Sequence, residues 1–385
     1  MNKPDARTPG LTYRQLYKTL KNRRVGITIT LLIGTLAIQG YARGEVENAQ
    51  STELLPKIAV IGTGGTIAGL SNSDGGYVSA EVDIDAMLQG LTAARSLAQL
   101  TGIQISNIGS QDMSHAVWLK LLAEVQSQAS STDVDGIIIT HGTDSLEETA
   151  FFLSHTYSGS KPVVLTAAMR PADALSADGP ANITDAIKTA LASRLAGGRV
   201  LVTMNGEIHE PRFVSKRHSE NLGAIQSVNG SLAGEIVHGW PRFYGPQQCQ
   251  KRKFTVRKSD TLPFVPIVYA HVDLRPEVVD LLVEAGAQGI VLAGYGNGNT
   301  SKPLLSALSR AGDAGVVIVR STKVGSGFVS RNVEIDDDDL GFIASQDLSP
   351  QKARVLLALS ILNEASAEDT QRFFFDQACS LANEL

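Results

Sequence analysis

An apolar run that breaks into glycines and threonines, at residues 58–69, constrains the fold of this chain more than any other stretch. Residues 58–61 predict a buried strand, and the glycines after them predict a tight turn at its end. Glycines let the backbone turn sharply and let a ligand approach without meeting Cβ atoms. Because open α/β sheets bind ligands at the carboxyl ends of their strands, Gly62 and the hydroxyl of Thr63 are candidates for a functional site.

Other interpretations of this turn compete with a reactive site. A dinucleotide-binding loop of the G-x-G-x-x-G type is disfavoured because its third glycine position holds Ile67. A phosphate-binding loop of the G-x-x-x-x-G-K type fails because no lysine follows the glycines. An ordinary tight turn without any ligand remains the alternative.

The same pattern recurs along the chain and predicts an α/β fold with two domains. A larger N-terminal domain, residues 56–240, has further predicted strands at 103–108, 134–140, 162–168 and 200–204. Predicted helices lie at 112–126 and near 183–195. We expect a mostly parallel open sheet flanked by helices, because strands and helices alternate. A smaller C-terminal parallel α/β domain, residues 266–385, has predicted strands at 265–270, 289–293 and 315–319, and residues 241–265 predict a linker.

Composition supports this class of fold. The chain has 385 residues, is 43% hydrophobic and contains 36 glycines, which is typical of globular α/β proteins. Its length is sufficient for two domains. The net charge of −5 argues against a general role in nucleic-acid binding.

The N-terminus differs from the rest of the chain. Four basic residues between positions 18 and 24 precede an apolar run at 25–38, and small residues follow up to Ala42. This order predicts a signal peptide, residues 1–42, which is followed by a flexible segment, residues 43–55. The apolar run is short for a membrane span, although an uncleaved anchor is the alternative. We therefore expect a periplasmic or secreted protein without a membrane association after cleavage.

The cysteines and histidines do not predict a metal site. Cys249 and Cys379 are the two cysteines of the chain, and their spacing does not decide whether they pair. The seven histidines show no metal-binding spacing, so we predict no metal.

Two polar segments follow the first two predicted strands. Residues 70–77 contain Gly75, Gly76 and the aromatic hydroxyl of Tyr77, and predict either a loop tip or a mobile lid over the glycine turn. Ser110 and Gln111 follow the strand at 103–108.

A third polar segment follows the strand at 134–140. Ser145 and Glu148 have the spacing of a capping box, so a helix is predicted to begin near Ser145. Thr143 and Asp144 then lie between a strand end and a helix N-terminus, where backbone N–H groups favour negative charge. Asp144 as a simple helix cap is the alternative, but it does not account for the neighbouring threonine.

Several motifs together resemble one known family. T-G-G-T-I-A-G at 63–69 and H-G-T-D-S-L-E-E-T-A at 141–150 are similar to the two signatures of bacterial-type L-asparaginases and the related glutaminase-asparaginases. Further similar motifs are G-S-Q-D at 109–112, A-M-R-P at 168–171, S-A-D-G-P at 176–180, G-N-G-N at 296–299 and P-Q-K-A-R-V-L-L at 350–357. The resemblance covers roughly residues 56–385, and the predicted secretion signal favours the secreted, type II branch.

The resemblance implies an amidohydrolase that converts L-asparagine to L-aspartate and ammonia, with glutamine as a secondary substrate. A glutamine-preferring enzyme of the same class and an amino-acid-binding module without turnover are the alternatives. We predict no cofactor. It implies that Thr63 is the nucleophile and that Tyr77 lies on the lid with Glu334 near the site. Thr143, Asp144 and Lys216 resemble a second catalytic group, with Lys216 placed by its V-S-K context. Gly62 borders the substrate position by its place in the glycine turn.

Substrate recognition is also implied by the resemblance. Ser110 and Gln111 resemble binders of the α-carboxylate, Asp144 and Glu334 binders of the α-ammonium, and Asn299 the residue of the second domain that reaches this site. The family's usual disulfide is not matched by the two cysteines, and residues 206–250 depart most from the family pattern. A homotetramer with active sites shared between subunits is the expected assembly.

Overall fold

The computed structural model describes residues 55–74, 76–79, 81–193, 198–244 and 254–376, except for the side chains of Tyr77 and Asp376. The predicted signal peptide, nearly all of the predicted flexible segment and both cysteines lie outside these residues.

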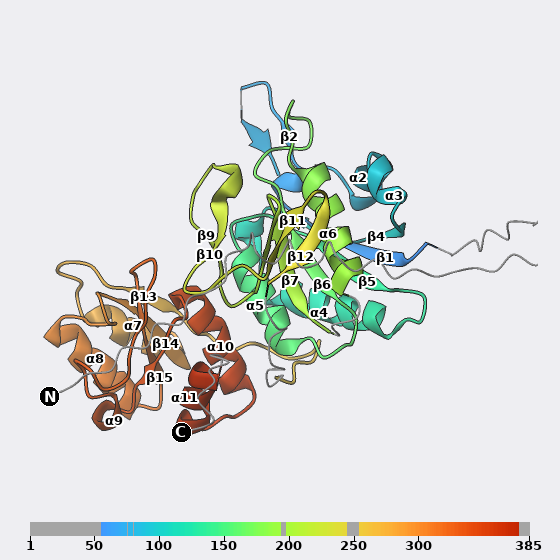
Figure 1. The fold of residues 1–385 in the computed structure, drawn as a ribbon. Helices are drawn as coiled ribbons and strands as arrows, with labels where there is room; N and C mark the ends of the chain where they lie inside the picture. The colour runs from blue at the N-terminus through green and yellow to red at the C-terminus, as the bar shows by residue number, and fades with distance from the viewer. Residues whose placement is uncertain (1–54, 75, 80, 194–197, 245–253, 377–385) are drawn as a thin grey trace, which may run out of the picture. The chain divides into compact units, whose positions relative to one another are not determined.

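The larger sheet has eight strands in the order β12-β11-β8-β7-β6-β5-β1-β4 (Figure 1). Its parallel strands are β1 (Lys57–Gly64), β4 (Gln99–Ile108), β5 (Gly136–Thr140), β6 (Val163–Thr166) and β7 (Val200–Met204). Antiparallel strands extend one side of it: β8 (Glu207–His209), β11 (Gly234–Val237) and β12 (Trp240–Phe243). The predicted mostly parallel open sheet is confirmed.

Helices cover both faces of this sheet, which explains why its central strands are apolar along their whole length. Side chains alternate between the faces of a strand. Accordingly, Ile137 and Ile139 of β5 pack in one core with residues of α4 (His115–Ser130) and α5 (Leu146–Thr156). Ile138 packs on the opposite face with residues of α2 (Ile84–Gln89) and α6 (Gly179–Ser193).

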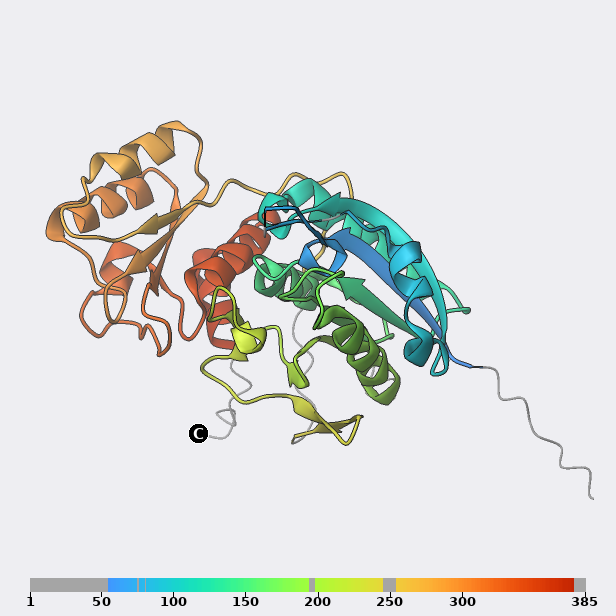
Figure 2. The ribbon, with the colours of Figure 1, turned by 90° about the horizontal axis from the view of Figure 1, so that it is seen from above.

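The smaller sheet is entirely parallel, with the order β13-β14-β15-β16. Its strands are β13 (Ile267–Tyr269), β14 (Gly289–Gly294), β15 (Val317–Thr322) and β16 (Ile343–Ala344). The helices of this part are α7 (Glu277–Glu284), α8 (Lys302–Asp313), α9 (Asp337–Leu340), α10 (Pro350–Leu362) and α11 (Ala367–Asp376). Helix α10 packs against both β14 and α5 (Figure 2), so one helix joins the two cores.

Some predicted boundaries were wrong, for local reasons. The helix predicted from residue 112 begins at His115, because Ser110–Asp112 forms a separate 3-10 turn and the Ser114 hydroxyl accepts the backbone N–H of Val117 at 3.4 Å. The strand predicted at 315–319 is β15, which runs from Val317 to Thr322.

Parts of the segment predicted as a linker belong to packed structure. Strand β12 continues to Phe243 and closes the edge of the larger sheet. Phe254, Leu262 and Val265 are buried in the same core as β5 and α10. Within the described part of the chain, no helix is long and apolar enough to cross a membrane.

The segment predicted as a mobile lid forms, where described, a small hairpin of β2 (Leu70–Ser71) and β3 (Tyr77–Val78). The Asn72 side chain accepts the backbone N–H of Gly76 at 2.8 Å and closes its turn. Both the N–H and the hydroxyl of Ser71 donate to the carboxylate of Asp173, each at 2.9 Å. These bonds attach the hairpin to the loop that follows β6.

Candidate active site

Three neighbouring parallel strands, β4, β1 and β5, end at one edge of the larger sheet. Gly62 of β1 lies opposite Thr140 of β5, and Gly64 lies opposite Ile108 of β4. Residues that follow these strand ends therefore meet at this edge. The predicted groups around Thr63, Ser110 and Thr143 are thus brought together by the register of the sheet.

Two turns at this edge touch through glycines. Gly65 has φ +86°, and a Cβ atom there would lie 2.4 Å from the backbone nitrogen of Gly142. A Cβ atom on Gly142 would lie 2.6 Å from the hydroxyl oxygen of Ser110. Neither position accommodates a side chain, because these distances are far below van der Waals contact. The backbone contact holds the turn after Thr63 against the turn that leads to Thr143.

The two threonines are buried and differ in their hydrogen bonds. Thr63 is 1% exposed, and its hydroxyl donates to the carbonyl oxygen of Thr140 at 2.9 Å. Thr143 is 5% exposed, and its hydroxyl oxygen accepts from Nζ of Lys216 at 2.8 Å. The same Nζ donates to the carboxylate of Asp144 at 2.6 Å. Lys216 is therefore placed to exchange a proton with the Thr143 hydroxyl while Asp144 balances its charge.

Strand β9 (Val214–Lys216) carries Lys216, and a lysine of helix α10 binds its backbone. Nζ of the buried Lys352 donates to the carbonyl oxygens of Arg212 at 2.7 Å and Val214 at 2.5 Å. Burial lowers the pKa of Lys352 to about 8. Arg212 forms a buried, two-pronged ion pair with Asp347. None of these supporting residues was predicted, although Lys352 stands in the P-Q-K-A-R motif.

The predicted capping box at the start of α5 is wrong, although the helix does begin after Ser145. The hydroxyl of Ser145 donates to the carbonyl oxygen of Ser110 at 2.6 Å, and Ser145 caps no helical N–H. Glu148 instead accepts from Arg354 of α10 at 3.0 Å. The hydroxyl oxygen of Ser110 accepts the backbone N–H of Asp144 at 3.1 Å. Tertiary bonds to the β4 turn have replaced the local cap.

Two cavities border predicted site residues, although neither is lined by Thr63 or Thr143. A cavity of about 430 Å³ is bordered by Ser110 and the exposed Gln111, and by the Glu148–Arg354 ion pair. Another of about 310 Å³ is bordered by Lys216. Either volume accommodates a small amino acid.

Asn299, Glu334 and Tyr77 are the remaining predicted site residues. Asn299 and Glu334 belong to the smaller α/β part, and the amide of Asn299 donates to the carboxylate of Glu334. Across the residues that the structure describes, neither is hydrogen-bonded to Thr63, Thr143, Asp144 or Lys216. The backbone of Tyr77 lies in β3, and its side chain is outside the described atoms.

Comparison with known families decides what this arrangement is. Residues 57–248 match the family described as "Asparaginase, N-terminal", and residues 264–374 match "Glutaminase/Asparaginase C-terminal domain". The chain belongs to the asparaginase family.

Individual asparaginase-family proteins are similar over most of their length. A "Probable L-asparaginase periplasmic" of Haemophilus influenzae is 41% identical over 327 residues, which are 84% of this chain and 93% of that protein. A "Glutaminase-asparaginase" of Acinetobacter glutaminasificans is 37% identical over 328 residues, 83% of this chain and 99% of that protein. The crystal structure of a "Probable Cytoplasmic L-asparaginase" from Campylobacter jejuni superposes with a TM-score of 0.76 at 37% identity and covers 83% of this chain and 99% of that one.

In this asparaginase-family chain, a buried histidine holds the turn that leads to Thr143. The indole N–H of Trp118 donates to the Thr149 hydroxyl at 2.9 Å. Thr149 can then donate its own proton to Nε2 of His141, 3.0 Å away. Nδ1 of His141 accordingly carries the proton that is donated to the carbonyl oxygen of Gly142 at 2.7 Å. Burial lowers the pKa of His141 to about 4, so the ring is neutral in the folded protein near neutral pH.

We expect His141 to make the fold sensitive to acid. The unfolded chain binds a proton on this ring below about pH 6.5, whereas the folded chain does not until about pH 4. The stability that the neutral His141 ring contributes is therefore fully present above its pKa in the unfolded chain. It is lost as the pH falls towards its pKa in the folded chain. At pH 5 the loss from this one group is about 2 kcal/mol relative to pH 7.

The measurement is the free energy of unfolding in urea at pH 7 and pH 5. The free energy of unfolding should differ less between pH 7 and pH 5 in His141→Asn than in the wild type, by about 2 kcal/mol. His271→Asn, at an exposed position, is the control and should leave the difference unchanged. An equal pH dependence in the wild type and His141→Asn would contradict the expectation.

Proposed function

We propose that this chain hydrolyses the side-chain amide of L-asparagine to L-aspartate and ammonia, with L-glutamine as a secondary substrate. The observation that carries the proposal is the contact between two turns that present Thr63 and Thr143, with Lys216 bonded to Thr143 and Asp144. Membership of the asparaginase family and the names of its relatives support the same activity.

In the proposed reaction the Thr63 hydroxyl attacks the amide carbon. The bond between the threonine oxygen and that carbon forms, the C–N bond breaks, and the threonine proton leaves with ammonia. A threonine hydroxyl is a weak nucleophile and requires a neighbouring base. Thr143, Lys216 and Asp144 are joined by hydrogen bonds and are assigned the relay of this proton, which in this structure the Thr63 hydroxyl donates to the carbonyl oxygen of Thr140. Water then cleaves the acyl-enzyme ester, which releases aspartate and restores Thr63.

The substrate's charged groups are assigned to the residues around this chemistry. Ser110 and Gln111 take the α-carboxylate, and Gly62 borders the substrate. Asp144 and Glu334 take the α-ammonium group, with Asn299 beside Glu334. Tyr77, whose backbone lies in the β2–β3 hairpin, is assigned to the lid of the site. No cofactor or metal takes part in this proposal.

The proposed assembly is a homotetramer in which each site receives Glu334 and Asn299 from a neighbouring subunit. The bond between these two residues, and the lack of bonds from either to the Thr63 group within the described chain, support it. The proposed location is the periplasm or the medium, after removal of residues 1–42. N-terminal sequencing of the exported protein should therefore begin at Arg43.

Ammonia release tests the proposed function. We expect turnover of L-asparagine, and a kcat/KM for L-glutamine that is lower by about 10–200-fold, the usual discrimination for one methylene. The rival function is capture of an amino acid without turnover. Binding of L-aspartate by calorimetry without any ammonia release from either amide would favour that rival and exclude the enzyme.

A further inference from the structure

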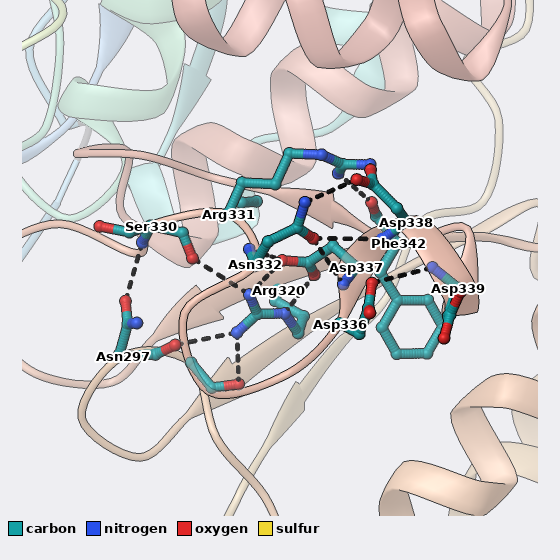
Figure 3. Close-up of polar contacts among 12 residues, drawn as sticks. Asn297, Arg320, Ser330, Arg331, Asn332, Asp336, Asp337, Asp338, Asp339 and Phe342 are labelled. Carbon is teal, nitrogen blue, oxygen red and sulfur yellow. Dashed lines mark hydrogen bonds and ion pairs between the residues drawn. The ribbon is translucent and has the colours of Figure 1, made fainter.

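A buried ion pair lies beneath the two segments that carry Asn299 and Glu334. Arg320 of β15 and Asp337 at the start of α9 are both 0% exposed. The guanidinium binds the carboxylate in a fork: Nε donates to one oxygen and Nη2 to the other, both at 2.6 Å (Figure 3). A buried pair of this kind is weak evidence for stability, because desolvation offsets much of the attraction. Its other contacts therefore need an explanation.

The remaining donors of Arg320 bind the turn that ends at Asn299. Nη1 donates to the carbonyl oxygens of Asn297 at 2.9 Å and Gly298 at 3.4 Å (Figure 3). The turn is closed by two backbone bonds of 2.8 Å between Tyr295 and Asn299. Gly298 has φ +77°, and a Cβ atom there would lie 3.0 Å from Nη1 of Arg320. The turn is therefore shaped against the guanidinium.

The same ion pair also holds the segment that carries Glu334. Nη2 of Arg320 donates to the carbonyl oxygen of Ser330 at 3.3 Å, and the carboxylate of Asp337 accepts the N–H of Asn332 at 2.9 Å. The side-chain oxygen of Asn332 accepts the N–H of Asp337 at 2.9 Å. These contacts fix the chain on both sides of Glu334.

A direct bond links the two segments to each other. The side-chain oxygen of Asn297 accepts the N–H of Ser330 at 2.8 Å (Figure 3). All five N–H donors of Arg320 are used in this network. Lysine has three donors on one nitrogen and lacks the planar fork, so it cannot reproduce these bonds.

We infer that Arg320 and Asp337 are positioning residues that set Asn299 against Glu334 and thereby tune recognition of the substrate's α-ammonium group. The inference rests on the proposed function, which places both residues at that group. Neither Arg320 nor Asp337 touches substrate in this account. They act by fixing two backbone segments, which leaves the amide chemistry at Thr63 unaffected.

The test compares L-asparagine with succinamate, which is the same amide without the α-amino group. In Arg320→Lys the ratio of kcat/KM for asparagine to that for succinamate should fall by about tenfold or more, mainly through a higher KM for asparagine. The value for succinamate should change by less than about threefold, because it makes no use of the ammonium site.

Matched variants separate positioning from general damage. Arg354→Lys alters an arginine–glutamate pair that borders the cavity of Ser110 and Gln111, the residues assigned to the α-carboxylate, which both amides carry. It should lower kcat/KM for both amides by the same factor and leave their ratio unchanged. Glu334→Ala should lower the ratio directly. If Arg320→Lys does not fold, Asn297→Ala removes the bond to Ser330 alone and should lower the ratio in the same direction.

An unchanged ratio in Arg320→Lys, or in Asn297→Ala if it replaces that variant, would overturn the inference while Glu334→Ala still lowers the ratio. An unchanged ratio in Glu334→Ala would overturn it as well. A wild-type protein that releases no ammonia from any amide would instead overturn the proposed function, and this inference with it.

Discussion

Thr63→Ala and Thr143→Val are each expected to lower kcat for ammonia release by about 10³-fold or more, which is the usual loss when a nucleophile or its proton relay is removed. Thr63→Ala removes the attacking oxygen. Thr143→Val keeps the shape of the side chain but removes the oxygen that accepts from Lys216 at 2.8 Å. Because both threonines lie where neighbouring strands end, at one edge of the larger sheet, neither substitution alters the core of the sheet.

The fold of both variants should stay intact. Loss of the single hydrogen bond from Thr63 to Thr140 costs about 1 kcal/mol, which thermal unfolding can measure. Thr166→Val is the matched control, because this buried threonine ends the neighbouring strand β6 and its hydroxyl oxygen has no hydrogen-bond partner in the described structure. It should keep wild-type kcat. If either test variant keeps more than about a tenth of wild-type kcat, the role assigned to that threonine is wrong.

Mixing two inactive variants should restore activity at about a quarter of all active sites. The variants are Thr63→Ala and Glu334→Ala, each of which removes one contribution to a site that two subunits share. In a mixed pair, one site has both substitutions and the other has none. Random mixing makes about half of the pairs mixed, and each mixed pair has one intact site.

The experiment is joint refolding of the two variants in equal amounts, followed by an ammonia assay. Each variant refolded alone is the control and should remain nearly inactive. If Glu334 acted within its own chain, every subunit would still lack one residue and mixing would restore nothing. Activity of the mixture no greater than the mean of the two parents would therefore exclude the shared site.

The sequence by itself determined the fold class and the order of the main elements. Continuous apolar runs predicted the central strands, because strands covered by helices on both faces need no polar side. Strand β7, at Val200–Met204, has the predicted bounds. Polar and glycine-rich segments after the strands located the candidate site, since parallel strands end at one sheet edge. The resemblance of the same segments predicted the asparaginase family, which the comparisons confirmed.

Local patterns were less informative where a tertiary partner competed with a local one. Ser145 and Glu148 have capping-box spacing, yet Ser145 donates to Ser110 and Glu148 binds Arg354. Both partners are far away in the sequence, so the spacing alone could not reveal them. The start of α4 was predicted three residues too early, because a local cap at Ser114 begins the helix at His115.

Only the tertiary structure decided which distant residues support the site. Gly65 meets Gly142, Lys352 binds the strand of Lys216, and Arg320 joins the segments of Asn299 and Glu334. The contacts of Lys352 and Arg320 are mostly to backbone carbonyl oxygens. This group is the same in every residue, whatever its side chain. A sequence pattern shows the side chain that donates but not the carbonyl that receives it, so these contacts depend on the folded arrangement of the chain.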